Sequence, residues 1–195
     1  PAEKKAFYRL LDNERLGTGD LESQLYAPLA AAISGRDVLV PCDTTTLDCS
    51  SNRLLKEDTT DHGPGFTGNH KGRGYWLHAC LALDASSNAL LGMADAIWWA
   101  RREHKRPHDF GRAWEDGESH RWWACCRDSA HRMPDARSVT YVQDRAGDIY
   151  GTFHHVRSMP GEHHLLSRTR AHRRIRTGCG KSLILTSCRA ALQWV

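Results

Sequence analysis

The fold of the chain is decided by two stretches, VLVPCDTTTLDCS at residues 38–50 and VTYVQDRAGDIY at residues 139–150. Each begins as a short run rich in β-branched and other apolar residues and then turns polar, which is the pattern of a buried strand. Asp43 and Asp144 lie where these two runs end. Because ligands of α/β sheets gather at the carboxyl ends of strands, the pattern predicts that the two carboxylates lie close together.

Two strand-end carboxylates on neighbouring strands can share divalent ions. Mg²⁺ favours one or two carboxylates together with water and phosphate oxygens. Two such ions ~3.5–4 Å apart activate a nucleophile and stabilise the leaving oxygen in phosphodiester chemistry. The competing interpretation is that both residues are local caps, since Asp43 precedes Thr44 and Thr45, and Asp144 precedes a predicted helix. The spacing alone leaves both interpretations open.

The rest of the chain predicts an α/β fold in which three strands are followed by a helix, a strand, a helix and a strand. This is the order of an RNase H-like mixed sheet flanked by helices. Residues 51–74 and 102–117 are rich in glycine or charge and are predicted as loops. The expected helices cover residues 3–12, 20–34, 118–132 and 147–156, and the expected strands cover residues 37–45, 74–85, 89–101, 138–144 and 164–170.

Composition excludes several classes of protein. Of the 195 residues, 40% are hydrophobic and 26% are charged, which is typical of a globular chain. No apolar run approaches the ~18 residues that a membrane span needs. The seven cysteines are odd in number, irregularly spaced and without a Cys-x-x-Cys pair. This argues against a disulfide framework and against a zinc site, and reduced thiols fit a cytoplasmic protein.

Charge is concentrated near the C-terminal end. The net charge of the whole chain is +4, yet residues 149–195 hold eight lysines and arginines against one acid, Glu162. Such a segment is either a solvated basic surface or a surface for a polyanion, most often nucleic acid. On the second interpretation, DNA would be contacted by the arginines that follow the second aspartate, namely Arg145, Arg168, Arg170, Arg173, Arg174 and Arg176.

Several motifs, taken in order, resemble bacterial insertion-sequence transposases of the DDE type, which cut and paste DNA. The two aspartate stretches resemble that family's Asp-Thr-Thr and Asp-Arg-x-x-Asp motifs, and the similarity spans roughly residues 4–176. The other matching segments are KKAFYRLLDNERL (4–16), GRGYWLHACLALDASSNALLGMADAIWWAR (72–101), GESHRWW (117–123) and LLSRTRAHRRI (165–175).

The resemblance implies a function and a division of the chain. Residues 1–35 would be a helical remnant of an N-terminal DNA-binding region, residues 36–176 a partial RNase H-like core, and residues 177–195 a tail unlike the family. Asp43 and Asp144 would be two of three catalytic carboxylates that hold two Mg²⁺ or Mn²⁺ ions. The reaction would be phosphodiester cleavage and strand transfer at transposon ends. The implied partners are double-stranded DNA, as transposon ends and target, and a second subunit, in the bacterial cytoplasm at the nucleoid.

The third carboxylate of the family is missing. It is a glutamate in a Tyr-Arg-x-x-x-x-x-x-Glu pattern, and nothing similar follows Asp148, where Glu162 is the only acid. We therefore expect a truncated or frameshifted copy, and its start at Pro1 suggests that the native N-terminus is absent as well. Three hypotheses stay open: an active transposase with the glutamate supplied from elsewhere, an inactive DNA-binding remnant, and another RNase H-like nuclease with Glu118 as third ligand.

Overall fold

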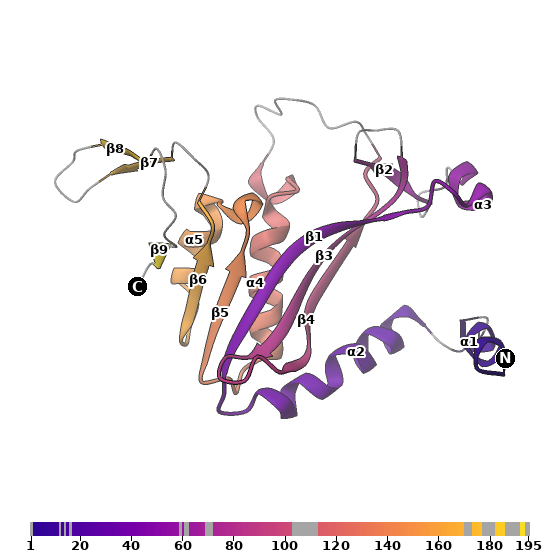
Figure 1. Ribbon diagram of the computed structural model, residues 1–195, viewed down its shortest axis with the longest axis horizontal. Coiled ribbons are helices and arrows are strands. Elements are labelled where there is room, and N and C mark those ends of the chain that lie inside the picture. The colour runs from indigo at the N-terminus through magenta and orange to yellow at the C-terminus, as the bar shows by residue number, and fades with distance from the viewer. Residues whose placement is uncertain are drawn as a thin grey trace.

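The computed structural model describes most of the chain. It covers residues 2–11, 13, 15, 17–58, 60, 63–68, 72–102 and 113–169, apart from a few side chains. Three short strands beyond residue 169 are described by their backbone. Figure 1 shows a curled mixed sheet with helices packed against it. The predicted α/β class, with a mixed sheet flanked by helices in RNase H-like order, is confirmed.

The strands and helices follow one another in the predicted order. Within the described residues the helical elements are α1 (Ala2–Leu11), α2 (Thr18–Ile33), α3 (Arg53–Glu57), η1 (Trp114–Asp116), α4 (His120–Arg132), η2 (Arg145–Gly147) and α5 (Tyr150–Arg157). The strands are β1 (Asp37–Asp48), β2 (Gly65–Thr67), β3 (Gly72–Asp84), β4 (Leu90–Trp99), β5 (Ser138–Gln143), β6 (His163–Ser167), β7 (Arg173–Arg176), β8 (Ser182–Leu185) and β9 (Leu192–Gln193).

The prediction that residues 51–74 form only loop was wrong, because α3 and β2 lie within this segment. Asn52 caps α3 by accepting a hydrogen bond from the Leu55 amide at 3.3 Å. The glycines that suggested a loop instead allow strands to approach closely. A Cβ atom at Gly74 would lie 1.9 Å from the carbonyl oxygen of Leu47, and one at Gly65 would lie 2.3 Å from that of Arg101.

Strand β1 lies in the middle of the larger sheet, whose order is β2-β3-β1-β5-β6-β9, with β4 paired to the other edge of β3. It runs antiparallel to β3 and parallel to β5. The pairing of β1 with β3 is interrupted between Leu39 and Cys42, where Pro41 has no amide hydrogen to donate. Strand β3 also shifts register against β4 on both sides of Leu81 and Ala82. Figure 1 shows that the sheet curls and that β1 and β3 continue together beyond β5.

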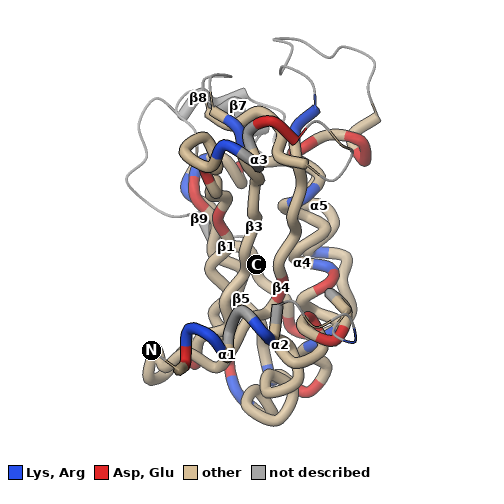
Figure 2. The backbone as a smooth tube through the Cα atoms, turned by 90° about the vertical axis from the view of Figure 1, so that its right-hand side faces the viewer, with Lys and Arg blue, Asp and Glu red and all other residues tan. Residues whose placement is uncertain are grey.

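The hydrophobic core lies between one face of the sheet and the helices α2, α4 and α5. Alternate residues of β1 are buried, and Val38, Val40 and Cys42 face this core with at most 3% exposure. Tyr141 of β5 is also buried in this core, and its hydroxyl donates to the Cys126 carbonyl of α4 at 2.8 Å. Figure 2 shows α4 and α5 on the same side of the strands. Leu29 and Ile33 of α2 complete the core, while the residues between the buried ones on β1 are only partly covered.

Two buried carboxylates are neutralised by arginines at the edge of the core. Asp95 of β4 is 3% exposed and accepts from Arg132 of α4 at 2.6 Å. Burial raises the pKa of the Asp95 carboxyl, and the arginine opposes that shift. Asp84 at the end of β3 pairs with Arg36 at 2.5 Å but also accepts from the amides of Ser86 and Ser87. The serines, followed by Arg36, lower the pKa of Asp84.

No helix in the described part of the chain is both long and apolar enough to cross a membrane.

We expect the free energy of unfolding to change differently when the arginine of each ion pair is replaced. Arg132→Met leaves the Asp95 charge buried without its cation, and we expect a loss of about 3 kcal/mol in the free energy of unfolding at pH 7. Because the folded-state pKa of Asp95 is raised, the carboxyl binds a proton more readily in the folded protein, so this loss shrinks as the pH falls towards 5. Urea denaturation at pH 7 and pH 5 measures it.

The matched control is Arg36→Met, where the serine donors still satisfy Asp84. A loss for Arg36→Met as large as that for Arg132→Met, or a loss for Arg132→Met that does not depend on pH, would contradict the assignment.

Candidate active site

The two predicted catalytic aspartates lie at one fork in the sheet. Strands β1 and β5 pair in parallel from Asp37 and Ser138 as far as Cys42 and Gln143. Asp43 and Asp144 are the next residues on each strand. Beyond this point β1 continues alongside β3, with Asp43 opposite Ala79, while the chain after Gln143 turns into η2. The two strands thus part where the acids lie.

Both aspartate side chains are exposed, and both point away from the core. Successive side chains of a strand alternate between its faces, so Asp43 lies on the face opposite Cys42. Asp144 follows Gln143, which is 4% exposed and faces the core. Because Cys42 and Gln143 are paired, the residues after them begin on the same outer face. The register supports the predicted proximity of the two acids.

One oxygen of each aspartate carboxylate also accepts a local hydrogen bond, as the capping interpretation expects. Asp144 precedes η2 in an extended conformation, and its Oδ1 accepts from the Ala146 amide at 2.7 Å. Asp43 Oδ1 accepts from the Thr44 amide at 2.7 Å. Each of these hydrogen bonds uses one oxygen of a carboxylate and orients the group. Capping and metal binding are therefore compatible at these positions.

The turn after Asp144 is packed tightly against the helix behind it. A Cβ atom at Gly147 would lie 2.6 Å from the Gln143 side chain and 2.8 Å from Cε3 of Trp122. Only glycine fits this contact, which holds η2 close to α4. Asp148, which follows, is 8% exposed and lies inside the fold rather than beside the exposed pair. Its burial favours a local structural role for Asp148 over metal binding.

His78 lies beneath the fork, in the core. It is fully buried, its Nδ1 is 2.8 Å from Thr44 Oγ1, and its ring meets Trp122 edge-on with centroids 4.4 Å apart. Burial, followed by the positive charge of Arg121, lowers the pKa of His78 to about 4, and Asp144 opposes this shift. The imidazole is therefore neutral at pH 7 and cannot supply a positive charge to the site.

Of the arginines predicted to contact DNA, the structure describes the side chains of only some. Arg145 and Arg168 are exposed and flank Asp144, since the Arg168 amide donates to the Gln143 carbonyl at 3.0 Å. Strand β7 contains Arg173, Arg174 and Arg176, of which the backbone is described, whereas Arg170 lies outside the described residues. Figure 2 shows basic and acidic positions mixed along the described chain. The two described arginines do lie next to the acidic fork.

Neither Glu118 nor Glu162 is placed to serve as the third metal ligand. Both oxygens of Glu118 accept from Arg101, at 2.7 and 2.6 Å, so this carboxylate is already neutralised. The carbonyl of Glu162 accepts from the Val139 amide at the start of β5. Five residues of strand at about 3.3 Å each separate that end of β5 from Asp144. Glu162 therefore lies at the opposite end of the sheet.

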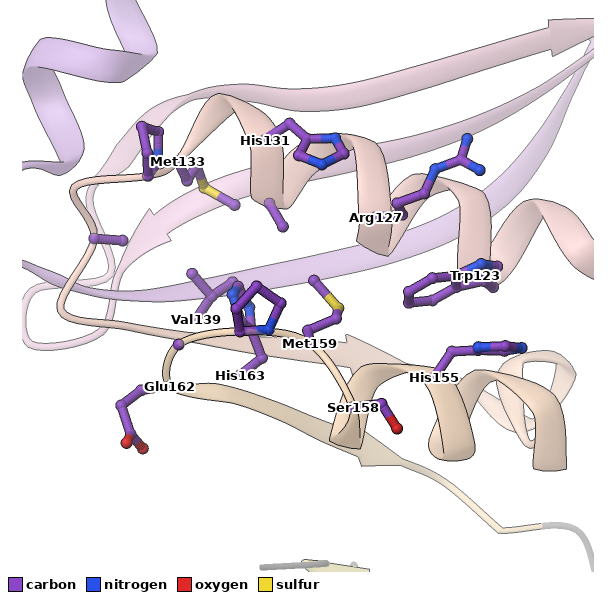
Figure 3. Close-up of a pocket in the computed structure, with 15 residues that line it drawn as sticks. Trp123, Arg127, His131, Met133, Val139, His155, Ser158, Met159, Glu162 and His163 are labelled. Carbon is purple, nitrogen blue, oxygen red and sulfur yellow. The ribbon is translucent and has the colours of Figure 1, made fainter.

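The pocket in Figure 3 is separate from the fork. Its volume is about 640 Å³, and it lies between the outer side of α4, the end of α5 and the loop before β6. Trp123, Arg127, His155 and Met159 contribute to its wall. Val139 and Glu162 place it at the end of β5 away from Asp144.

The sequence argument against a zinc site missed one group of residues. Cys42, His78 and Cys80 are all buried, and one ligand atom from each lies within 4.8 Å of the others. They come from two strands 36 to 38 positions apart, so no short motif could reveal them. The available signal was their alternation: His78 and Cys80 share one face of β3, and Cys42 faces inward on β1.

Comparison with known proteins does not assign the chain to a family. No protein-family model matches the chain. Among solved structures, a piggyBac transposase in a synaptic complex with hairpin DNA is similar with a TM-score of 0.39 and 8% identity. The similarity covers 83% of this chain and 31% of that one, so the chain spans about a third of that protein. A similarity this low assigns neither a fold relationship nor a function.

Proposed function

We propose that the chain is the front part of the catalytic core of a DDE-type DNA transposase, with Asp43 and Asp144 as two of its metal-binding carboxylates. The observation that carries the proposal is the register of β1 and β5, which brings the two strand ends to one fork in the sheet. The motifs around both residues, which resemble those of insertion-sequence transposases, supply the reaction type. On this basis residues 1–35, 36–176 and 177–195 keep the division proposed from the sequence.

The donors at the fork suit a hard divalent cation. Both aspartates are exposed and offer carboxylate oxygens, which Mg²⁺ and Mn²⁺ prefer together with water and phosphate oxygens. When bound, such ions would activate the attacking oxygen and stabilise the leaving one. The local hydrogen bonds from the Thr44 and Ala146 amides orient the two carboxylates towards this role.

We propose that DNA is the partner of this surface, with transposon ends and target as its substrates, a second subunit as its companion and the bacterial cytoplasm as its location. Arg168 lies beside Asp144 and is exposed, so it can contact a phosphate next to the one held at the fork. Phosphate contacts of this kind position DNA without reading its sequence.

By itself the chain is expected to be inactive. Two Mg²⁺ ions bring a formal charge of +4, and two aspartates offset half of it. A third carboxylate would hold one ion in place, whereas water in its position allows the ion to move. Small displacements of a reacting group cost ~100-fold in rate. Because Glu118 is neutralised by Arg101, the alternative of another RNase H-like nuclease has less support than an inactive DNA-binding remnant.

The metal site can be tested by direct binding. Mn²⁺ bound to the chain is measured by the loss of the electron paramagnetic resonance signal of the free ion. We expect Asp43→Asn and Asp144→Asn each to weaken binding by at least about tenfold, because each removes a charged ligand. Asp48→Asn is the matched control, since Asp48 is exposed on the same strand and accepts from the Ser50 amide at 2.7 Å. Equal weakening by Asp48→Asn would remove the assignment.

The DNA surface can be tested through its dependence on salt. Binding through phosphates releases counterions, so affinity for a duplex should fall steeply between low and moderate salt. Arg168→Gln should reduce the slope of that dependence by about one ion. Arg53→Gln on α3 is the control, since that arginine is exposed and pairs only locally with Glu57 at 3.1 Å. An affinity that ignores salt, or an equal effect of both variants, would exclude this surface.

The inactivity of the isolated chain is checked by a nicking assay. Supercoiled plasmid is incubated with Mg²⁺ or Mn²⁺ and with the wild type, Asp43→Ala or Asp144→Ala. We expect the three proteins to give the same background of nicked product. Nicking by the wild type that both substitutions abolish would show that a third ligand is present after all.

A further inference from the structure

The inner face of the fork is a cluster of thiols. Cys42 and Cys80 lie directly opposite one another on β1 and β3, with their sulfurs 2.7 Å apart. His78 lies two residues before Cys80 on the same face of β3. All three side chains are at most 3% exposed. Their donor atoms lie within 4.8 Å of one another, close enough to surround one small ion.

Helix α4 closes the cluster from above with two further thiols. Cys125 and Cys126 are fully buried, and Cys125 Sγ lies 3.9 Å from the His78 carbonyl oxygen. Gln143 Nε2 donates to Cys126 Sγ at 3.4 Å. Four of the five free cysteines in the described part of the chain therefore meet here, and only Cys49 lies outside the group.

His78 offers a donor that the described protein does not use. Its Nδ1 faces Thr44 Oγ1 at 2.8 Å, whereas Nε2 is buried and has no hydrogen-bond partner among the described residues. Buried polar atoms are nearly always satisfied, and each exception calls for an explanation such as an ion. This observation is independent of the cysteines and concerns a residue of the same cluster.

We propose that Cys42, His78 and Cys80 form a buried site for a zinc-type ion, completed by one thiol of α4. Thiolate and imidazole are the donors that Zn²⁺ takes in closed structural sites. Binding releases the protons of the ligating thiols, and the neutral imidazole coordinates through its lone pair. Zn–S bonds of ~2.3 Å in tetrahedral geometry place two sulfurs ~3.8 Å apart. The separation between the Cys42 and Cys80 sulfurs would thus have to grow by about 1 Å.

A disulfide between Cys42 and Cys80 accounts for less of what is seen. It would use two sulfurs and leave the imidazole Nε2 and both thiols of α4 without a role. It would also need a peroxide or another disulfide to reach sulfurs that are at most 3% exposed. An ion can be taken up while the chain folds and then enclosed. The unsatisfied imidazole nitrogen and the buried thiols that α4 contributes nearby therefore favour the ion.

The proposed site is distinct from the carboxylate fork, although Cys42 and Asp43 are adjacent in the chain. The two side chains lie on opposite faces of β1, one buried and one exposed. The inner donors are soft sulfur and nitrogen, and the outer donors are hard oxygen. The two sites should therefore select different ions.

Co²⁺ is the probe, because its absorption reports thiolate ligands and tetrahedral geometry directly. The full-length chain, reduced and freed of metal, is titrated with Co²⁺ under argon. We expect one equivalent to give thiolate-to-cobalt charge-transfer bands, with tetrahedral bands in the visible, and Zn²⁺ to abolish both. Cys42→Ser and Cys80→Ser should weaken binding by more than the roughly 10–100-fold that loss of an outer-shell partner costs. His78→Asn should shift the visible bands.

Two controls separate this site from other effects. Cys49→Ser should leave the titration unchanged, because Cys49 lies outside the cluster. Asp43→Asn should also leave the Co²⁺ titration unchanged. A failure of the proposed Mg²⁺ site can therefore be distinguished from a failure of the buried site. If a cluster variant does not fold, as judged by circular dichroism, the absorption spectrum of the Co²⁺-loaded wild type still tests the proposal. A wild type that shows no charge-transfer band at one equivalent of Co²⁺ would overturn the proposal. So would a wild type that is isolated without metal and with a mass two hydrogens below that of the reduced chain, because that mass indicates a disulfide.

Discussion

Strand β1 has to satisfy two partners at once, and the rest of the structure depends on this constraint. It runs parallel to β5 on one side and antiparallel to β3 on the other. Its inward residues must be small enough to pack under α4, and its pairing with β3 is interrupted at Pro41. Beyond Cys42, β1 leaves β5 and follows β3. The separation of the two strands is what opens the fork.

The alternation of side chains along β1 gives neighbouring residues opposite chemistry. Val38, Val40 and Cys42 are buried, and Asp43 begins the exposed part of the strand. A shift of one residue in register would place a carboxylate in the core and a thiol in water, at a cost that few proteins could tolerate. The position of Asp43 is therefore determined by packing as much as by any chemistry that it performs.

Much of this arrangement could be predicted from the sequence, because it depends on local periodicity. The strands that end at Asp43 and Asp144 and the helix that bears Trp122 were all predicted close to where they lie. Residues 51–74 were misjudged because glycine was taken as a sign of a loop, whereas Gly65 and Gly74 allow close packing between strands. The ion pair between Glu118 and Arg101 and the meeting of Cys42 with Cys80 depend on tertiary contacts. No local pattern could have predicted them.

The parallel pairing of β1 with β5 also sets the order in which the protein can fold. Ser138 Oγ of β5 donates to Asp37 of β1 at 2.7 Å across 101 residues of chain. During synthesis β1 can pair with β3, which emerges soon after it, long before β5 exists. Closing so large a loop is slow, and contacts of this range delay completion of the fold. Cys42 and Cys80 would therefore meet early and stay open to solvent until α4 arrives, which makes the nascent chain, rather than the finished protein, the form most vulnerable to oxidation.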